Sequence, residues 1–482
     1  MKRTWLGIDQ GSTATKACLL DYRGRVRRVI TRPIATRTPF AGWVEHDPEA
    51  LVRSVRAVLA EILRGRPAGE TAGLGIACQR STCLFWEADS GKPLTAALSW
   101  QDLRGETICR SLARHASDVA RRTGLRLSPH YAAGKIRWLF ERHPGLRRLA
   151  ASGRARFGTL DAYLLFRLTS GASWSTDSTH AARTLLMDLD TLEWDPDLLG
   201  LFGVPRRCLP PIRPSAFPAG VVRIGGARLR IAATLGDQQA ALLGVGCGRR
   251  GEMVINYGTG AFAALNTGRR PVRRAGLLAS VAWSSETGAR FLLEGPVNAA
   301  GSALDWIDGL LRADAGGAAL ERDLDRLPIF IPALGGLGAP HWRSDVRGAL
   351  LDLRRDTRPE QIQAAALAGI ACRIREIVER MRHSGRPIRR IVTAGGLTRR
   401  RGLLPFQAGL LGAPLLHALS PDATARGAAL LAGHACGAWD LEGADAPVSP
   451  VRRVRGMSPS RALEDYYGRF VARRKMLTAP AS

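Results

Sequence analysis

The chain has 482 residues, of which 45% are hydrophobic and 23% are charged, a balance typical of a globular protein with a full core and two or three domains. Its longest nearly apolar run, around 427–433, is far shorter than the ~20 residues of a membrane span, and no signal-peptide core is expected behind Met1. Lys and Arg number 70 against 42 Asp and Glu, a net charge of +28. These features exclude a collagen, a coiled coil, a membrane protein and a small disulfide-stabilised domain.

The N-terminal part predicts an α/β fold that begins with three short strands. Two apolar strands flank the polar turn Gln10–Thr13, and a third strand follows a second turn. A helix with Asp47 as its N-cap and Pro48 at its first position comes next. The expected strands cover residues 5–9, 16–20, 26–30 and 74–78, and the expected helices cover residues 48–63, 103–113 and 133–140.

The same strand–turn–strand pattern returns in the second half of the chain. A strand leads into the turn Gly258–Gly260, another strand leaves it, and a later strand ends at the pair Gly395 and Gly396 before a helix. The expected strands cover residues 252–257, 261–265 and 391–396, and the expected helix covers residues 403–411. The repeat indicates duplication of one fold with a break near residues 244–251. We expect two homologous domains, residues 1–247 and 248–482, that face a cleft.

The glycine turns have a chemical use. Glycine lets backbone N–H groups approach a phosphate, and a neighbouring Ser or Thr hydroxyl adds a donor. Asp9 ends the first strand, where its carboxylate is placed to hold Mg²⁺ through water. Two such turns, one in each domain, would hold a polyphosphate from both sides.

Several other patterns carry no function here. The sequence Gly246–Gly251 matches G-x-G-x-x-G, but it follows a helix-like segment and precedes a strand, the reverse of a dinucleotide-binding unit. No Walker P-loop pattern is present. His180, His341 and His434 have no metal-ligating neighbour at a suitable spacing, so we interpret each as a structural histidine.

Asp237, in the segment Leu235–Gln239, is the strongest candidate for catalysis. An Asp that follows Gly and opens a short helix is either a simple N-cap or a base that accepts a proton from an alcohol as it attacks a phosphoryl group. The local sequence leaves both interpretations open.

A series of short motifs in a fixed order resembles the FGGY family of carbohydrate kinases, and most closely its glycerol kinase branch. The motifs begin at Gly7, Gly42, Gln79, Gly91, Trp100, Gly158, Gly236, Tyr257, Gly336 and Ala394. The resemblance implies two duplicated actin-like ATPase (ribonuclease H-like) domains around a nucleotide cleft. It also implies transfer of the γ-phosphoryl of Mg-ATP to a hydroxyl of a polyol or ketose.

The resemblance also assigns roles position by position. It implies that Asp237 is the catalytic base and that Asp9 and Asp237 hold Mg²⁺. The implied acceptor-binding residues are Arg80, Ser81, Trp100, His130, Asp237, Gln238 and Phe262. The implied nucleotide-binding residues are Gly11, Ser12, Thr13, Lys16, Thr259, Gly260, Gly301, Gly395, Gly396 and Arg400.

Four positions depart from the glycerol kinase pattern. Ser81 stands where the pattern has Glu, and His130 where it has Tyr, with Tyr131 one place along; Asp305 replaces Gln, and Arg400 replaces Asn near the adenine. Because a changed set of polar groups rejects a ligand by large factors, we expect an acceptor other than glycerol. A glycerol kinase in the strict sense and a non-catalytic ATP-binding regulator remain the alternatives.

The expected partners follow from charge and cysteine content. The arginines are spread along the chain without a nucleic-acid-binding motif, so we expect a small-molecule polyol or sugar, no specific nucleic acid and no membrane. A homodimer is left open. Eight scattered cysteines without a Cys-x-x-Cys pair predict a reduced, cytoplasmic protein.

Overall fold

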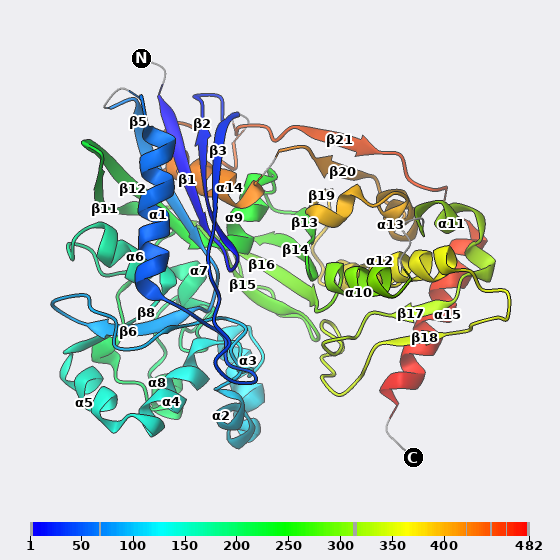
Figure 1. The fold of residues 1–482 in the computed structure, drawn as a ribbon, viewed down its shortest axis with the longest axis horizontal. Coiled ribbons are helices and arrows are strands. Elements are labelled where there is room, and N and C mark those ends of the chain that lie inside the picture. Colours follow the sequence, from blue (N-terminus) through cyan, green and yellow to red (C-terminus); the bar gives the residue numbers. More distant parts are fainter. Residues whose placement is uncertain are drawn as a thin grey trace.

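A computed structural model describes residues 3–66, 69–311, 316–420, 422–443, 446–458 and 460–479. Each half of the chain is built on one large mixed β-sheet, and the two halves lie side by side (Figure 1). The first sheet has the order β11 (Ala216–Ile224), β12 (Ala227–Gly236), β5 (Thr71–Cys78), β1 (Thr4–Gln10), β2 (Ala14–Leu20) and β3 (Val26–Pro33). The second has the order β15 (Leu278–Ser285), β16 (Gly288–Val297), β14 (Ala261–Gly268), β13 (Glu252–Tyr257), β19 (Arg390–Ala394), β20 (Leu415–Ala418) and β21 (Val451–Val454).

The two large sheets share one connectivity. Strand β1 pairs antiparallel with β2 and parallel with β5, and strand β13 likewise pairs antiparallel with β14 and parallel with β19. The next parallel pairs, β5 with β12 and β19 with β20, continue the correspondence. The duplication predicted from the repeated strand–turn–strand pattern is therefore confirmed by the topology.

Smaller elements complete both halves. A four-stranded sheet of the first half has the order β4 (Glu45–His46), β7 (Ala97–Leu98), β6 (Cys83–Glu87) and β8 (Ala155–Thr159). Two-stranded sheets pair β9 (Thr176–Asp177) with β10 (Ile212–Arg213) and β17 (Ile329–Ile331) with β18 (Ala349–Leu351). The helices of the first half are α1 (Pro48–Leu63), α2 (Glu106–Ser111), α3 (Ala116–Thr123), α4 (Ala132–Arg142), α5 (Pro144–Ser152), α6 (Leu160–Leu168), α7 (Ser178–Ala181), α8 (Pro196–Phe202) and α9 (Asp237–Gly244). Those of the second half are α10 (Gly301–Leu311), α11 (Gly316–Arg322), α12 (Pro359–Arg382), α13 (Leu403–Leu411), α14 (Ala423–Ala435) and α15 (Arg461–Thr478).

Helix α14 joins the halves, because it follows β20 of the second sheet in the sequence but packs on β1, β5 and α9 of the first half. Its close approach depends on glycine. A Cβ built on Gly427 would lie 1.8 Å from the carbonyl oxygen of Ala240 in α9, and one built on Gly7 of β1 would lie 1.9 Å from that of Ala425. One hydrophobic core accordingly contains residues of both sheets together with α9 and α14. The division at residues 247 and 248 stays a prediction.

Local sequence signals place several elements correctly. Helix α1 covers residues 48–63 as predicted, and the Asp47 side chain accepts a hydrogen bond from the backbone N–H of Glu49. The helix predicted over residues 103–113 is wrong at its start, since α2 begins at Glu106. The Asp102 carboxylate accepts hydrogen bonds from the backbone and side chain of Arg104 and holds this segment in a turn.

Two further observations concern membrane-spanning helices and the cysteines. Within the described ranges, no helix is both long enough and apolar enough to span a bilayer. All eight cysteines are free thiols, and seven of them are buried.

Candidate active site

Two glycine hairpins carry the predicted phosphate-binding residues. In the turn between β1 and β2 the backbone N–H of Gly11 donates to the carbonyl of Ala14, at 3.0 Å. In the corresponding turn between β13 and β14 the N–H of Gly258 donates to the carbonyl of Gly260, at 2.8 Å. Backbone hydrogen bonds close both turns, and Ser12, Thr13 and Thr259 keep partly or fully exposed positions.

The second hairpin also starts helix α10. The backbone N–H of Gly301 donates to the carbonyl of Gly258, and that of Ser302 to the carbonyl of Thr259. A Cβ on Gly301 would lie 2.7 Å from the oxygen of Gly258, so only glycine fits where the helix meets the turn. Gly395, with φ of 98°, lies close to the carbonyl of Tyr257 at the end of β13. The predicted nucleotide glycines of the second half therefore converge on this turn.

Two acidic side chains lie near the carboxyl ends of strands of the first sheet, Asp9 in β1 and Asp237 directly after β12. Asp9 pairs with Lys16 of β2, one position before the last pair of these strands, and Lys16 forms an ion pair with Asp422, which precedes α14. Burial and the charge of Asp237 raise the pKa of Asp9 to about 7, although Lys16 opposes the shift. The two carboxylates thus form an incompletely neutralised negative pair.

Asp237 is the first residue of α9, and Gly236 occupies the N-cap position. The alternative that Asp237 is a simple N-cap is therefore wrong. Its Oδ1 accepts a hydrogen bond from the backbone N–H of Gln238 at 2.7 Å and lies 3.5 Å from Nε of Arg80. Burial raises the pKa of Asp237, and the Arg80 guanidinium opposes the increase. A partly buried carboxylate of this kind suits proton acceptance.

Arg80 also pairs with Glu294, a residue that the sequence analysis missed. Glu294 lies in β16 of the second sheet, and its Oε2 is 2.9 Å from Nη1 of Arg80. Its other oxygen pairs with Arg183. Burial alone would raise the pKa of Glu294, but the two arginines outweigh burial and lower it to about 2. The only sequence signal for this pair was a carboxylate within an apolar strand, which requires a charged partner.

Trp100 and His130 come from separate loops of the first half and meet beside the first hairpin. The indole N–H of Trp100 donates to Oγ of Ser12 at 3.1 Å, and Nδ1 of His130 lies 3.0 Å from the carbonyl of Trp100. The Trp100 side chain is 40% exposed, so its ring is available to a ligand. Lys135, also missed from the sequence, is fully buried and donates to the carbonyls of Ser99 and His130.

The remaining predicted acceptor residues lie at different depths. Ser81 is buried with a φ of 64°, and its hydroxyl donates to the carbonyl of Arg183. Tyr131, the neighbour of His130 and not itself a predicted acceptor residue, is buried with its ring 5.1 Å from the Arg183 guanidinium. Phe262 shares a face of the second sheet with Glu294, because β14 and β16 pair Phe262 with Pro296 and Ala264 with Glu294. Their contacts with an acceptor stay predictions.

Arg400 follows the short 3₁₀ helix after Gly395, and its guanidinium pairs with Asp308 of α10 at 2.5 Å. The pair therefore links the two segments that flank the predicted nucleotide position. Asp305 lies in the exposed part of α10. Whether either residue contacts the base stays a prediction.

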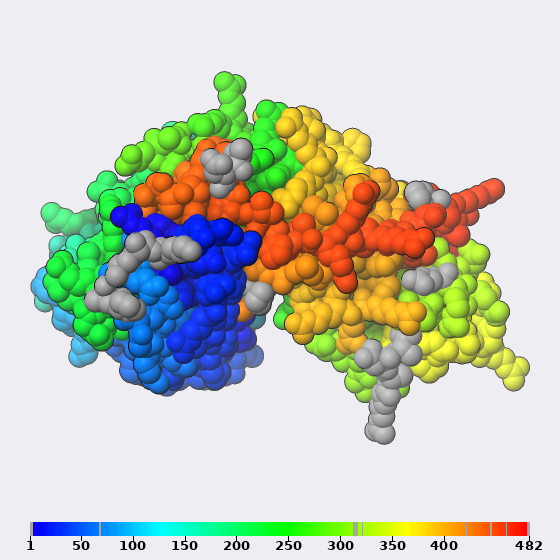
Figure 2. Space-filling view, turned by 90° about the horizontal axis from the view of Figure 1, so that it is seen from above, coloured from blue at the N-terminus to red at the C-terminus, as the bar shows by residue number. Residues whose placement is uncertain are grey.

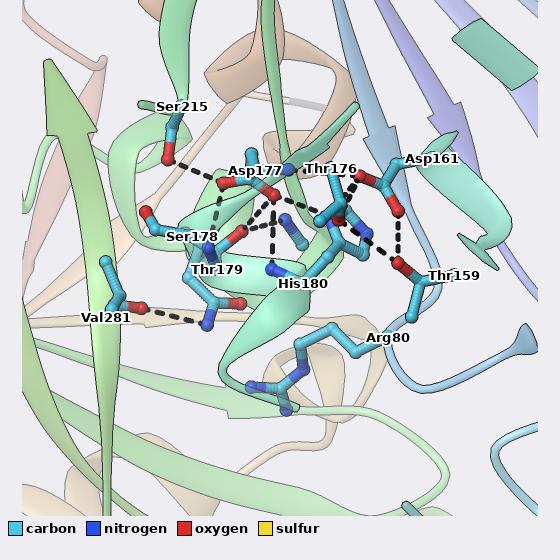
Figure 3. A network of polar contacts seen from close by, with 12 residues as sticks. Arg80, Thr159, Asp161, Thr176, Asp177, Ser178, Thr179, His180, Ser215 and Val281 are labelled. Carbon is cyan, nitrogen blue, oxygen red and sulfur yellow. Dashed lines mark hydrogen bonds and ion pairs between the residues drawn. The ribbon is translucent and has the colours of Figure 1, made fainter. Parts of the chain in front are cut away.

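His180 has charged partners, which its isolation in the sequence did not indicate. It lies with Asp161 and Asp177 in a fully buried cluster (Figure 3). Nε2 of His341 pairs with the Glu376 carboxylate, and Nδ1 of His434 lies near the Trp439 carbonyl and the Asp440 carboxylate. The structural interpretation of these two histidines stays a prediction.

Comparison with known proteins agrees with this architecture. Residues 4–244 match the N-terminal domain of the FGGY family of carbohydrate kinases, and residues 253–436 match its C-terminal domain. The glycerol kinase of Thermus brockianus is 42% identical over 448 residues, which cover 90% of each chain. The glycerol kinase of Plasmodium falciparum, solved with ADP, has a TM-score of 0.91 at 26% identity and covers 100% of this chain and 99% of its own.

Sugar kinases share the fold at greater distance. The ligand-bound xylulose kinase of Lactobacillus acidophilus superposes with a TM-score of 0.87 at 22% identity over 99% of both chains. The two duplicated α/β domains are therefore those of the actin-like ATPase fold, as predicted. The chain belongs to the FGGY family of carbohydrate kinases, ATP-dependent phosphotransferases with an alcohol group as acceptor.

Proposed function

We propose that this kinase phosphorylates a hydroxyl of a polyol or ketose other than glycerol, with Asp237 as the general base. The observation that carries the proposal is the position of Asp237, which opens α9 between the Arg80 guanidinium and the carboxylate of Asp9. A base at this place reaches an alcohol held by Arg80 and faces the hairpin that would hold the phosphates. Proton acceptance at Asp237 Oδ would then accompany attack of the alcohol oxygen on the γ-phosphorus.

The other residues position and shield the reactants. Arg80 would hydrogen-bond acceptor hydroxyls, and the exposed face of Trp100 would cover the carbon backbone. The backbone N–H groups and hydroxyls of the two hairpins would bind the ATP phosphates. Figure 2 shows an indentation between the lobe that begins the chain (blue) and the opposite lobe (orange and yellow), where domain closure would exclude water.

The donor set also fits Mg²⁺. Asp9 and Asp237 offer oxygen ligands, and burial together with the charge of Asp237 raises the pKa of Asp9, so a divalent cation would relieve an unfavourable charge pair. We propose that these two carboxylates hold Mg²⁺, directly or through water, and the ion would neutralise charge on the β- and γ-phosphates.

A second candidate function is that of a glycerol kinase in the strict sense. It is favoured by relatives of that name that are 36–42% identical to this chain over at least 90% of its length. Ser81 and His130 argue for a different acceptor, because neither provides the carboxylate or phenol expected for glycerol at these positions. Both candidate functions transfer the γ-phosphoryl group of ATP to an alcohol, and they differ only in which alcohol accepts it.

One experiment tests the proposal and separates the two acceptors. ADP release from Mg-ATP is measured with glycerol, erythritol, pentitols, ketopentoses and ketohexoses, for the native chain and for Asp237→Asn. We expect one acceptor to dominate in kcat/KM and Asp237→Asn to lose kcat by about 10²- to 10⁴-fold. Near-normal turnover by the variant would reject Asp237 as base, and glycerol as the best acceptor would establish the second candidate. The cytoplasmic location and the oligomeric state stay predictions.

A further inference from the structure

A buried ionic cluster lies behind the helix that carries Asp237. Asp161, Asp177 and His180 are all inaccessible to solvent, and Nδ1 of His180 lies 2.7 Å from Oδ1 of Asp177 and 3.7 Å from Oδ2 of Asp161. The cluster sits where α6, β9 and α7 meet (Figure 3).

The histidine serves as the cation of this cluster. Burial alone would lower the pKa of His180, but Asp161 and Asp177 outweigh burial and raise it to about 9. The oxygens of the two carboxylates already accept hydrogen bonds from protein groups, among them Thr159 and Thr176 for Asp161 and Ser215 for Asp177. An imidazolium therefore fills the place that a metal ion would otherwise take.

Stability alone does not explain the cluster. Buried ion pairs are often no better for stability than apolar groups of the same shape, because desolvating the charges costs several kcal/mol. Nε2 of His180 is in addition buried without a hydrogen-bond partner among the described residues, which is a further cost to stability.

The Thr179 hydroxyl connects the cluster to the backbone directly before the proposed base. The Thr179 hydroxyl donates to Oδ1 of Asp177 at 2.9 Å and accepts a hydrogen bond from the backbone N–H of Gly236 at 2.8 Å. Gly236 is the residue immediately before Asp237 and the N-cap of α9. The Thr179 hydroxyl hydrogen points to the Asp177 carboxylate, so an oxygen lone pair of the hydroxyl is left to accept the hydrogen bond from this N–H.

We propose that Thr179 is a positioning residue: its hydroxyl, oriented by the Asp177–His180 pair, fixes the backbone at Gly236 and thereby the position of Asp237. The inference rests on the proposed function, since it assumes that Asp237 is the base. It assigns to the buried cluster a role in catalysis although none of its members reaches the substrate.

The direct test replaces the hydroxyl and keeps the shape. Thr179→Val removes both hydrogen bonds, and Thr179→Ser retains them. We expect Thr179→Val to lose kcat by about 10- to 100-fold, since small misplacements of a catalytic group have effects of this size, with the KM for ATP changed less than twofold. Thr179→Ser should recover kcat to within about threefold of the native value.

Two further variants make the result decisive. Thr169→Val removes a buried hydroxyl that donates to the carbonyl of Leu165 and accepts from the backbone N–H of Ser173, and it should leave kcat unchanged at a similar loss in thermal stability. Asp177→Asn keeps the side-chain shape and weakens the orientation of Thr179, so it provides the test if Thr179→Val does not fold; it should also lower kcat.

The possible outcomes are distinct. A folded Thr179→Val or Asp177→Asn protein with kcat within twofold of native overturns the inference. Equal losses in Thr179→Val and Thr179→Ser would also overturn it, because packing and not the hydroxyl would then be responsible. If Asp237→Asn keeps its turnover, the proposed base itself fails, which is a separate result.

Discussion

Nη1 of Arg80 lies 2.9 Å from Oε2 of Glu294, and this ion pair joins the two halves of the chain beside the proposed base. Because Glu294 also pairs with Arg183, it holds two guanidinium groups in place at once. The orientation of the Arg80 side chain therefore depends on a carboxylate contributed by the second sheet.

Replacing Glu294 by Gln should loosen Arg80 without touching the nucleotide turns. We expect the KM for the acceptor to rise about tenfold, as for the loss of one hydrogen bond to a charged group, while the KM for ATP stays within twofold. Steady-state kinetics with each substrate varied in turn provides the measurement.

A matched control is available in the second half. Glu376 is equally buried and pairs with Arg373 and Arg474, far along the chain from the acceptor residues. Glu376→Gln should lower the melting temperature and leave both KM values unchanged. An unchanged acceptor KM in Glu294→Gln would show that Arg80 needs no support from the second sheet.

Gly236→Ala should displace the Arg80 side chain by a steric clash. A Cβ at this position would lie 2.8 Å from Cγ of Arg80 and 2.7 Å from Oε1 of Gln239, while the φ of −66° suits alanine. The flexible Arg80 side chain would move, so we expect kcat/KM for the acceptor to fall about 10- to 100-fold. Calorimetry should show unchanged ADP binding.

Gly200→Ala in α8 is the control, since a Cβ there meets no atom within 4 Å. It should leave kcat/KM unchanged. If Gly236→Ala behaves in the same way, the narrow space beside Arg80 has no role in orienting it.

Local chemistry made much of the fold predictable. The N-cap Asp47, Pro48 and apolar periodicity defined α1 over its full length, and the glycine turns marked both hairpins. These signals act over a few residues, so they can be read from the sequence without knowledge of the fold. The repeated order of strand and turn then indicated the duplication.

The missed features depend on contacts between distant parts of the chain. Arg80 and Glu294 are 214 residues apart, and α14, which lies between β20 and β21 of the second sheet in the sequence, packs on β1 and β5 of the first. No local pattern indicates which carboxylate a buried arginine will meet, or that Asp161 will meet His180. Such partners follow from the packing of the whole fold.

Lys135 predicts a pH dependence of stability. The lysine is fully buried, and burial lowers its pKa from 10.5 to about 8. Between these two pH values the unfolded chain binds more protons than the folded chain, so stability attributable to Lys135 rises with pH. Relative to Lys135→Met, the native protein should gain roughly 3 kcal/mol between pH 8 and 10.5.

Urea unfolding at pH 7, 8, 9 and 10 checks this difference, with Lys475→Met, on the exposed face of α15, as the control. The free energy of unfolding of the native protein minus that of Lys135→Met should increase through the series. A difference that is flat, or that falls with pH, would show that Lys135 stays protonated in the folded protein.

Gly427→Ala should disrupt the packing of α14 on α9. The added Cβ would lie 1.8 Å from the carbonyl oxygen of Ala240 and 2.6 Å from its carbonyl carbon, and backbone atoms cannot rotate away as a side chain can. We expect a loss of at least about 3 kcal/mol in the free energy of unfolding. Gly468→Ala in α15 meets no atom within 4 Å and should instead stabilise the protein by up to about 1 kcal/mol through helix propensity. Urea unfolding of both variants measures the contrast, and equal effects would mean that α14 does not need its close contact with α9.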